Sequence, residues 1–161
     1  MEEQPIKLFL LFGEHAREMI SPETGLEFLK TFCLSNENYV TKLRSKYTIQ
    51  MILNGNPDSR KDVENGDYCK RMNKNGVDLN RNWGSHWKKV HFPQITKGGD
   101  KESQTYSGEE PFSEPETKTF KSYIESFKPK VFLTIHSGVK GMYIPFAYSQ
   151  DECKENHDVM V

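Results

Sequence analysis

The stretch Ile6-Lys7-Leu8-Phe9-Leu10-Leu11-Phe12-Gly13-Glu14-His15-Ala16-Arg17-Glu18 joins an apolar run to a His and a Glu three residues apart. The apolar run predicts a buried strand, because parallel strands that are covered on both faces read as continuous apolar segments. Side chains three residues apart point the same way where the backbone coils, since three residues make nearly one helical turn. We therefore expect His15 and Glu18 on the loop at the strand's carboxyl end, where open α/β sheets build their sites.

A second apolar run also ends in a histidine: Lys130-Val131-Phe132-Leu133-Thr134-Ile135-His136-Ser137-Gly138. If the two runs are neighbouring parallel strands, His136 arrives at the same sheet edge as His15 and Glu18. Two His and one Glu, with the fourth position left to water, are a ligand set of catalytic zinc. On its own the His-x-x-Glu pair is also compatible with a solvated helix surface, so the metal prediction depends on the second run.

The segment Gly76-Val77-Asp78-Leu79-Asn80-Arg81-Asn82-Trp83 supplies polar side chains that suit such a site. Asp78 is a candidate for accepting the second ring N–H of a zinc-bound His. Arg81 has a planar fork that matches a carboxylate, and Asn80 adds an amide donor beside it, as recognition of a substrate's terminal carboxylate requires. Upstream, Arg71 is a candidate for stabilising the oxyanion that forms when a carbonyl is attacked. A polar turn with a structural Arg–Asp pair remains an alternative.

Five segments of the chain carry a family resemblance: Gly13–Glu18, Asn56–Asp58, Gly76–Trp83, Pro111–Thr117 and Ile135–Ser137. In this order they resemble the zinc metallocarboxypeptidases of the pancreatic-carboxypeptidase type, over a region from about Lys7 to Tyr148. The resemblance implies one Zn²⁺ ion held by His15, Glu18 and His136. It also implies that Asp78 lies behind His15.

The resemblance further implies how a substrate is held. It places Asn80 and Arg81 on the C-terminal carboxylate of a peptide or protein, and Arg17 at a position associated with substrate contacts. Arg71 occupies the oxyanion-stabilising position, although Lys70 lies next to it. The reaction expected from the family is removal of C-terminal residues. The alternatives are a non-catalytic module that binds zinc and a C-terminus, and a zinc amidohydrolase that acts on acylated amino acids.

The fold expected from the resemblance is α/β with three layers: a mixed, mostly parallel sheet with helices on both faces. We expect a single domain over 1–161 that is an incomplete catalytic domain, truncated at both ends. Hydrophobic residues make up 35% of the chain, and counting Gly in place of Tyr gives roughly 38% against the usual ~45–50%. In the family, the glutamate that activates the zinc-bound water lies well after the third ligand. We expect no such glutamate before Val161, and therefore no turnover by this chain alone.

The coarse pattern predicts strands over Ile6–Phe12, Tyr47–Leu53, Val131–Ile135 and Met142–Tyr148, and helices over Pro22–Leu34, Asn38–Ser45 and Glu114–Phe127. Ser21 and Ser113 are the expected N-caps of the first and last helices. Cys33 is expected in the core on an apolar helix face. Residues 54–112 are polar with little periodicity, and so long a loop in a compact domain indicates function.

The charge and the termini exclude several classes of partner. A net charge of −1 gives no attraction to nucleic acids or anionic membranes. The segment Arg81–Phe92 interleaves basic and aromatic side chains as single-strand binders do, but no basic excess accompanies it. No apolar run is long enough to span a membrane, and Met1–Pro5 is acidic and polar, unlike a signal peptide. The compartment, the oligomeric state and the disulfide state of Cys69 and Cys153 stay open.

Overall fold

The computed structural model describes residues 4–87 and 103–147. Its sheet has three strands in the order β2-β1-β3, and both strand pairs are parallel. The strands are β1 (Ile6–Phe12), β2 (Tyr47–Ile52) and β3 (Val131–Ile135). The helices are α1 (Ile20–Leu34), α2 (Asn38–Lys46), α3 (Pro57–Glu64) and α4 (Pro115–Phe127), with a short 3₁₀ helix, η1, at Leu79–Arg81.

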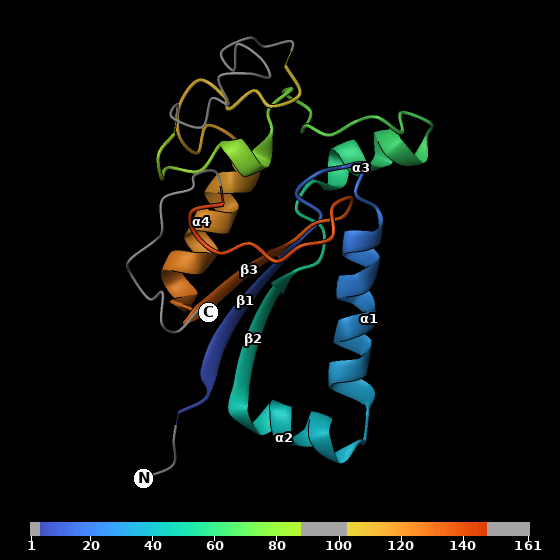
Figure 1. Ribbon diagram of the computed structural model, residues 1–161, viewed down its shortest axis with the longest axis vertical. Coiled ribbons are helices and arrows are strands. Elements are labelled where there is room, and N and C mark those ends of the chain that lie inside the picture. Colours follow the sequence, from blue (N-terminus) through green and yellow to red (C-terminus); the bar gives the residue numbers. More distant parts are fainter. Residues whose placement is uncertain (1–3, 88–102, 148–161) are drawn as a thin grey trace.

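Helices cover both sides of the sheet, as the family resemblance implies. Figure 1 shows α4 on one side of the three strands and α1 on the other, with the long loops gathered beyond one end of the sheet. The expected α/β class with a parallel sheet between helices is therefore confirmed. Among residues 4–87 and 103–147, no helix is long and apolar enough to cross a bilayer.

The central strand β1 contributes to packing on both of its faces. A core cluster on the α4 side consists of Phe9, Leu11, Leu79 and Phe120, each at most 2% exposed. On the α1 side, Gly25 lies so close to the Phe12 ring that an added Cβ would sit 2.9 Å from it. The absence of a side chain at Gly25 thus lets α1 approach the sheet.

The prediction that both apolar runs are covered on both faces is wrong for β3. Phe132 is 40% exposed and Leu133 is 47% exposed. These side chains are exposed because β3 lies at the edge of the described sheet: β1 pairs with one of its edges, and no described strand pairs with the other. The predicted strand Met142–Tyr148 is also wrong, because residues 142–147 form no strand, and Tyr148 lies outside the described part of the chain.

Helix α1 begins two residues earlier than predicted and does not use Ser21 as its N-cap. Met19 occupies the cap position, and Ser21 is buried inside the first turn. The Ser21 hydroxyl accepts a hydrogen bond from Gly13 N at 3.1 Å and donates one to Ile135 O at 2.5 Å. This side chain therefore joins the ends of β1 and β3. Cys33 is exposed rather than in the core, because only Ser21 and Gly25 of α1 are fully buried.

Two further expectations about helices differ from the structure. Helix α4 begins at Pro115 with Glu114 at its cap position, and Ser113 instead donates to Glu114 Oε1 at 2.7 Å. Helix α3 lies within the segment that the sequence predicts as loop. It escaped detection because it buries only Ser59 and Val63, which give no apolar periodicity. Cys153 lies outside the described residues.

Candidate metal centre

Two strand ends deliver the three candidate ligands to one place. Phe12 pairs with Ile135, so β1 and β3 end level with each other, and His136 follows immediately. After β1 the chain turns at Gly13, whose φ of +71° is unfavourable for residues with a side chain. His15 and Glu18 then lie in one turn, in which Glu18 N donates to His15 O at 3.1 Å.

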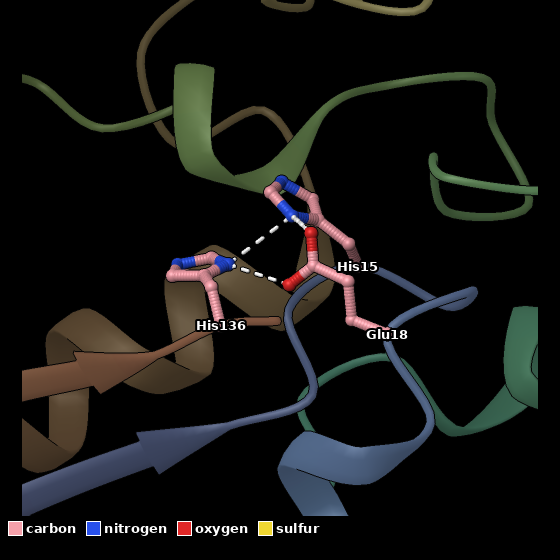
Figure 2. Close-up of side chains that lie close together, drawn as sticks. All are labelled: His15, Glu18 and His136. Carbon is pink, nitrogen blue, oxygen red and sulfur yellow. Dashed lines mark hydrogen bonds and ion pairs between the residues drawn. The ribbon is translucent and has the colours of Figure 1, made fainter. Parts of the chain in front are cut away.

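The candidate ligand atoms point at one another, as Figure 2 shows. The Nδ1 atoms of His15 and His136 are 3.2 Å apart. Glu18 bridges them, with Oε1 at 2.7 Å from His15 Nδ1 and Oε2 at 2.9 Å from His136 Nδ1. The structure thus brings together the three residues that the sequence nominates as ligands, from positions up to 121 residues apart.

The spacing of these atoms fits a zinc ion. Donors placed tetrahedrally at about 2.0–2.1 Å from zinc lie ~3.3 Å from one another. The two Nδ1 atoms are 3.2 Å apart, close to this value. Glu18 presents a different oxygen to each ring, Oε1 at 2.7 Å and Oε2 at 2.9 Å, and one ligand atom from each of the three residues lies within 4.8 Å of the others. Two imidazole nitrogens and a carboxylate oxygen are also the donor types that zinc prefers.

His15 is held from behind by Asp78. His15 Nε2 lies 3.0 Å from Asp78 Oδ1, and both side chains are almost completely buried. Asp78 also caps η1 by accepting from Asn80 N at 3.0 Å. A metal-binding His is commonly oriented by a carboxylate on its second nitrogen, and Asp78 has the position for that function.

Arg71 lies on the far side of Asp78. Its Nε and Nη2 atoms donate to Asp78 Oδ2 at 2.9 and 2.8 Å. Its Nη1 atom lies 3.8 Å from Glu18 Oε1, next to the ligand cluster. The guanidinium is therefore close enough to the cluster to act on a group bound there, although the structure commits two of its nitrogens to Asp78.

The substrate-binding candidates lie at different distances from the cluster. The Asn80 amide nitrogen is 3.5 Å from His136 Nε2. Arg81 donates to Asn80 O at 2.9 Å and is half-buried on η1. Arg17 is exposed and points away, with Nη1 donating to Gln104 Oε1 at 2.9 Å and to Cys69 O at 3.3 Å.

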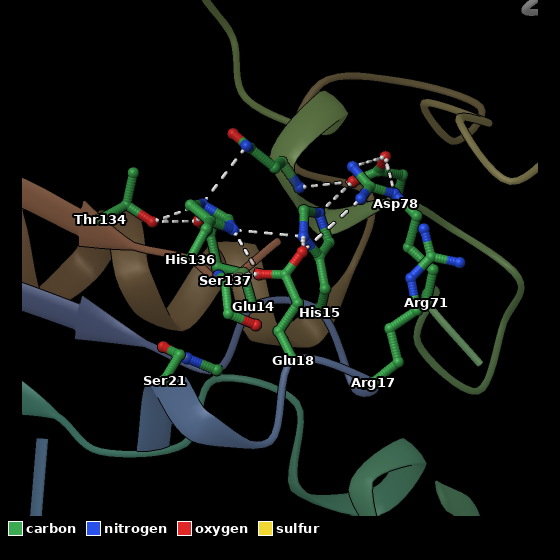
Figure 3. Close-up of polar contacts among 12 residues, drawn as sticks. Glu14, His15, Arg17, Glu18, Ser21, Arg71, Asp78, Thr134, His136 and Ser137 are labelled. Atoms are coloured by element: carbon green, nitrogen blue, oxygen red, sulfur yellow. Dashed lines mark hydrogen bonds and ion pairs between the residues drawn. The ribbon is translucent and has the colours of Figure 1, made fainter. Parts of the chain in front are cut away.

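The second nitrogen of His136 meets two residues that the sequence analysis did not nominate. His136 Nε2 is 3.2 Å from Glu14 Oε2 and 3.0 Å from Thr134 Oγ1. Figure 3 shows Glu14, Thr134 and His136 grouped on one side of the cluster, with Asp78 and Arg71 on the other. One sequence signal could have identified Glu14: it is an acidic residue close to the end of a buried strand, where an unpaired carboxylate is costly.

The electrostatics of the cluster are strongly coupled. Burial alone lowers the pKa of His136, but hydrogen bonds to Glu14 and Glu18 outweigh it and raise that pKa to about 9. For His15, burial is likewise outweighed by hydrogen bonds to Asp78 and Glu18, so its pKa is raised. Burial raises the pKa of Glu18, yet hydrogen bonds from His136 and His15 hold it well below the usual range. The carboxylates next to the two rings thus favour the protonated form of each histidine in the absence of a metal ion.

A parallel α/β sheet whose strand ends gather two histidines and a glutamate around one point defines a candidate metal-binding centre. The family model for zinc carboxypeptidases matches residues 4–161. The chain therefore belongs to the zinc carboxypeptidase family.

Individual relatives agree with this membership. Zinc carboxypeptidase A 1 of Drosophila melanogaster is 30% identical over 152 residues, which cover 89% of this chain and 34% of the relative. Carboxypeptidase B of Astacus astacus is 29% identical over 160 residues, covering 92% of this chain and 50% of the relative. This chain thus spans about a third to a half of the length of these curated relatives.

A solved structure supports the fold over nearly the whole chain. The crystal structure of thrombin activatable fibrinolysis inhibitor (TAFI) superposes with a TM-score of 0.84 at 25% sequence identity. The superposition covers 99% of this chain and 41% of that one.

Proposed function

We propose that this chain forms the metal-binding part of a zinc-dependent carboxypeptidase that removes residues from the C-terminus of peptides or proteins. One observation carries the proposal: the donor atoms of His15, Glu18 and His136 face one another, and the Nδ1 atoms of the two histidines are 3.2 Å apart. All three side chains direct a donor atom toward one point, and the Glu18 carboxylate carries a negative charge there. A divalent cation bound at that point would be held by all three, and zinc fits the donor types.

In this proposal each polar side chain around the cluster has a separate task. A bound zinc ion would polarise the scissile carbonyl and lower the pKa of bound water toward ~7. Asp78 keeps the His15 ring in one orientation and tautomer through its contact with Nε2. Arg71, with Nη1 at 3.8 Å from Glu18, stabilises the negative charge that develops on the carbonyl oxygen.

In this proposal, residues of η1 recognise the C-terminal carboxylate of the substrate. Arg81 supplies a planar pair of donors and Asn80 an amide donor, and both lie on the same turn above the cluster. A free C-terminal carboxylate bound there would leave the last peptide bond near the metal, so that only the terminal residue is released. Arg17 is a more distant substrate contact in this scheme, because its guanidinium faces Gln104.

We further propose that the described residues, 4–87 and 103–147, supply metal and substrate contacts but no general base at the cluster. The three carboxylates that contact the cluster histidines already have tasks: Glu18 is a ligand, and Asp78 and Glu14 each face an imidazole Nε2. None of the three is free to take a proton from an attacking water molecule, as a general base must.

The first test is zinc binding by the metal-free protein. We expect one zinc ion per chain in the parent, and none in His15→Ala. The matched control is His86→Ala, which removes an exposed histidine outside the cluster and should leave the stoichiometry at one. Equal zinc content in the parent and in His15→Ala would contradict the ligand assignment.

The second test concerns the substrate. We expect the zinc-loaded protein to bind a short peptide with a free C-terminus and not the same peptide with an amidated C-terminus. An acylated amino acid serves as the probe for the amidohydrolase alternative. Equal binding of the free and amidated peptides would exclude recognition of the terminal carboxylate by Arg81 and Asn80.

A further inference from the structure

Glu14 is a buried carboxylate that the proposed reaction uses neither as a metal ligand nor as a substrate contact. It is only 1% exposed, although it stands in the loop directly after β1. Burying an ionised carboxylate costs several kcal/mol by order of magnitude unless hydrogen bonds satisfy it. Its surroundings therefore indicate what the residue does.

Three side chains from different parts of the fold converge on this carboxylate. Trp83 Nε1 donates to Glu14 Oε1 at 3.2 Å, and the Thr134 hydroxyl donates to Glu14 Oε2. His136 Nε2 lies 3.2 Å from the same Oε2 atom. Figure 3 shows Glu14 next to His136, with Asp78 on the other side of the cluster. Both carboxylate oxygens are thus occupied, and one of them faces a candidate metal ligand.

The direction of the hydrogen bond from His136 follows from the cluster. His136 Nδ1 faces His15 and Glu18, so a metal ion bound there would take its lone pair. The ring proton then belongs on Nε2, which lies 3.0 Å from the Thr134 hydroxyl oxygen and 3.2 Å from its ionic partner, Glu14 Oε2. Thr134 supports the arrangement, since its oxygen lies 3.0 Å from Nε2 while its hydroxyl donates to Glu14.

The contact to Glu14 repeats, for His136, what Asp78 does for His15. His15 Nε2 is 3.0 Å from a buried Asp78 oxygen, and His136 Nε2 is 3.2 Å from a buried Glu14 oxygen. Besides Glu14, His136 Nε2 has the Thr134 oxygen at 3.0 Å and the Asn80 amide nitrogen at 3.5 Å, and the amide nitrogen is itself a donor that cannot accept the ring proton.

The charge balance around the cluster is consistent with this arrangement. Glu14, Glu18 and Asp78 carry three negative charges next to the two imidazoles. Arg71 supplies one positive charge through its contacts with Asp78. Arg81 also acts on Asp78. A divalent cation would add two further positive charges, so the Glu14 carboxylate offsets part of the positive charge that metal binding brings.

We propose that Glu14 is a positioning residue that fixes the ring orientation and the tautomer of His136 for metal binding. The inference rests on the proposed function, because it assumes that His136 is a metal ligand. The inference adds a second carboxylate–histidine pair, Glu14 with His136, to the pair formed by Asp78 and His15. Loss of such an outer partner typically weakens metal affinity by about 10- to 100-fold.

The test compares two buried glutamates. Glu14→Gln removes the charge next to His136, whereas Glu114→Gln makes the same change in a 5% exposed glutamate that is bonded to Asn73 and Asn75 instead. Zn²⁺ is titrated into each metal-free protein against a chromophoric chelator, and the absorption spectrum of bound Co²⁺ reports the ligand geometry. We expect Glu14→Gln to lose about 10- to 100-fold in affinity and to change the cobalt spectrum. Glu114→Gln should match the parent in both.

A double-mutant cycle separates positioning from a general structural effect. If Glu14 acts through His136, Glu14→Gln lowers zinc affinity no further in a His136→Ala background. An equal additional loss in that background overturns the inference. If Glu14→Gln does not fold, Thr134→Val removes the hydroxyl that bridges Glu14 and His136, and unchanged affinity and spectrum in that variant overturn the inference.

The outcomes also distinguish this inference from the proposed function. If the parent binds zinc, His15→Ala does not, and Glu14→Gln binds as tightly as the parent, only the role of Glu14 is wrong. If the parent binds no zinc, the proposed function itself fails.

Discussion

Strands β1 and β3 place the same residues opposite each other in very different surroundings. Phe9 pairs with Phe132 and Leu10 pairs with Leu133. Phe9 and Leu10 are 0% and 7% exposed, whereas Phe132 and Leu133 are 40% and 47% exposed. The difference arises because β1 has a strand on each side, and β3 has a described partner on one side only. An apolar run therefore predicts a strand but not its place in the sheet.

The two strands are nevertheless equivalent at their carboxyl ends. Each delivers one histidine whose Nδ1 faces the cluster and whose Nε2 contacts a buried carboxylate. The side chain of His136 is 26% exposed and that of His15 is 2% exposed. Burial along the strand and function at its end are thus set by separate parts of the structure.

The largest expected effect tests this equivalence. We expect His15→Ala and His136→Ala to weaken zinc binding to a similar extent. Each loss should exceed the decrease of about 10- to 100-fold that is typical when a residue hydrogen-bonded to a ligand is removed. Each variant deletes one of the three proposed ligands, and burial of the ring does not change that count. Isothermal titration with Zn²⁺ measures both. Normal affinity in His136→Ala would show that β3 contributes no ligand.

The second prediction tests the difference in burial with a matched pair. Phe9→Ala should lower the free energy of unfolding by about 3–5 kcal/mol, as expected for a fully buried aromatic ring. Phe132→Ala should cost about half as much or less, because its ring is 40% exposed and keeps contacts mainly with Phe9 and Trp83. Urea unfolding of the metal-free protein measures both changes. Equal costs would indicate that a further segment or a second copy covers β3 in solution.

The third prediction concerns pH and the more exposed histidine. The pKa of His136 is raised to about 9 from its ordinary value of 6.5. Stability that its protonation contributes to the metal-free protein is therefore complete below pH 6.5 and is lost as the pH rises through about 9. We expect a loss on the order of 1–3 kcal/mol over this range, measured by urea unfolding at several pH values.

Zinc affinity should change in the opposite direction over the same range, because the metal competes with the proton on His136 Nδ1. The His136→Gln variant is the control, since it has no imidazole to titrate there. If its unfolding free energy falls as steeply with pH as that of the parent, His136 is not the responsible group.

The smallest expected effect lies on the exposed flank of β3. Leu133→Thr should change the free energy of unfolding by no more than about 0.5 kcal/mol, because an exposed strand position tolerates a β-branched polar residue. Leu10→Thr, at the paired position of β1, should cost several times more, since it buries an unpaired hydroxyl. Thermal unfolding of the two variants compares them directly.

Much of the fold could be predicted from local sequence signals. The bounds of β1 and β3 match the apolar runs, and the helix expected over Asn38–Ser45 differs from α2 by one residue. Helix α3 could not be found in this way, because a short helix that buries two side chains leaves no periodic pattern. The exposure of Cys33 was also out of reach, since it depends on what packs against α1 beyond Gly25.

The sequence predicted the candidate metal ligands better than the residues that surround them. The cluster of His15, Glu18 and His136 follows from residue spacing and from parallel strands that end level, and the structure brings these side chains together. Ser21 and Glu14 gave no comparable signal. Ser21 resembles an ordinary helix cap, and Glu14 resembles a loop residue, until the ends of β1 and β3 are placed side by side.

The sequence by itself determined which segments become strands and which donor types stand at their ends, because apolar runs and side-chain spacing are local properties of the chain. Only the tertiary structure decided that β1 is central and β3 lies at an edge, and that Asp78 and Glu14 each meet a different histidine. These features depend on contacts between residues far apart in the sequence. Such contacts are set by how whole elements pack, which no local pattern encodes.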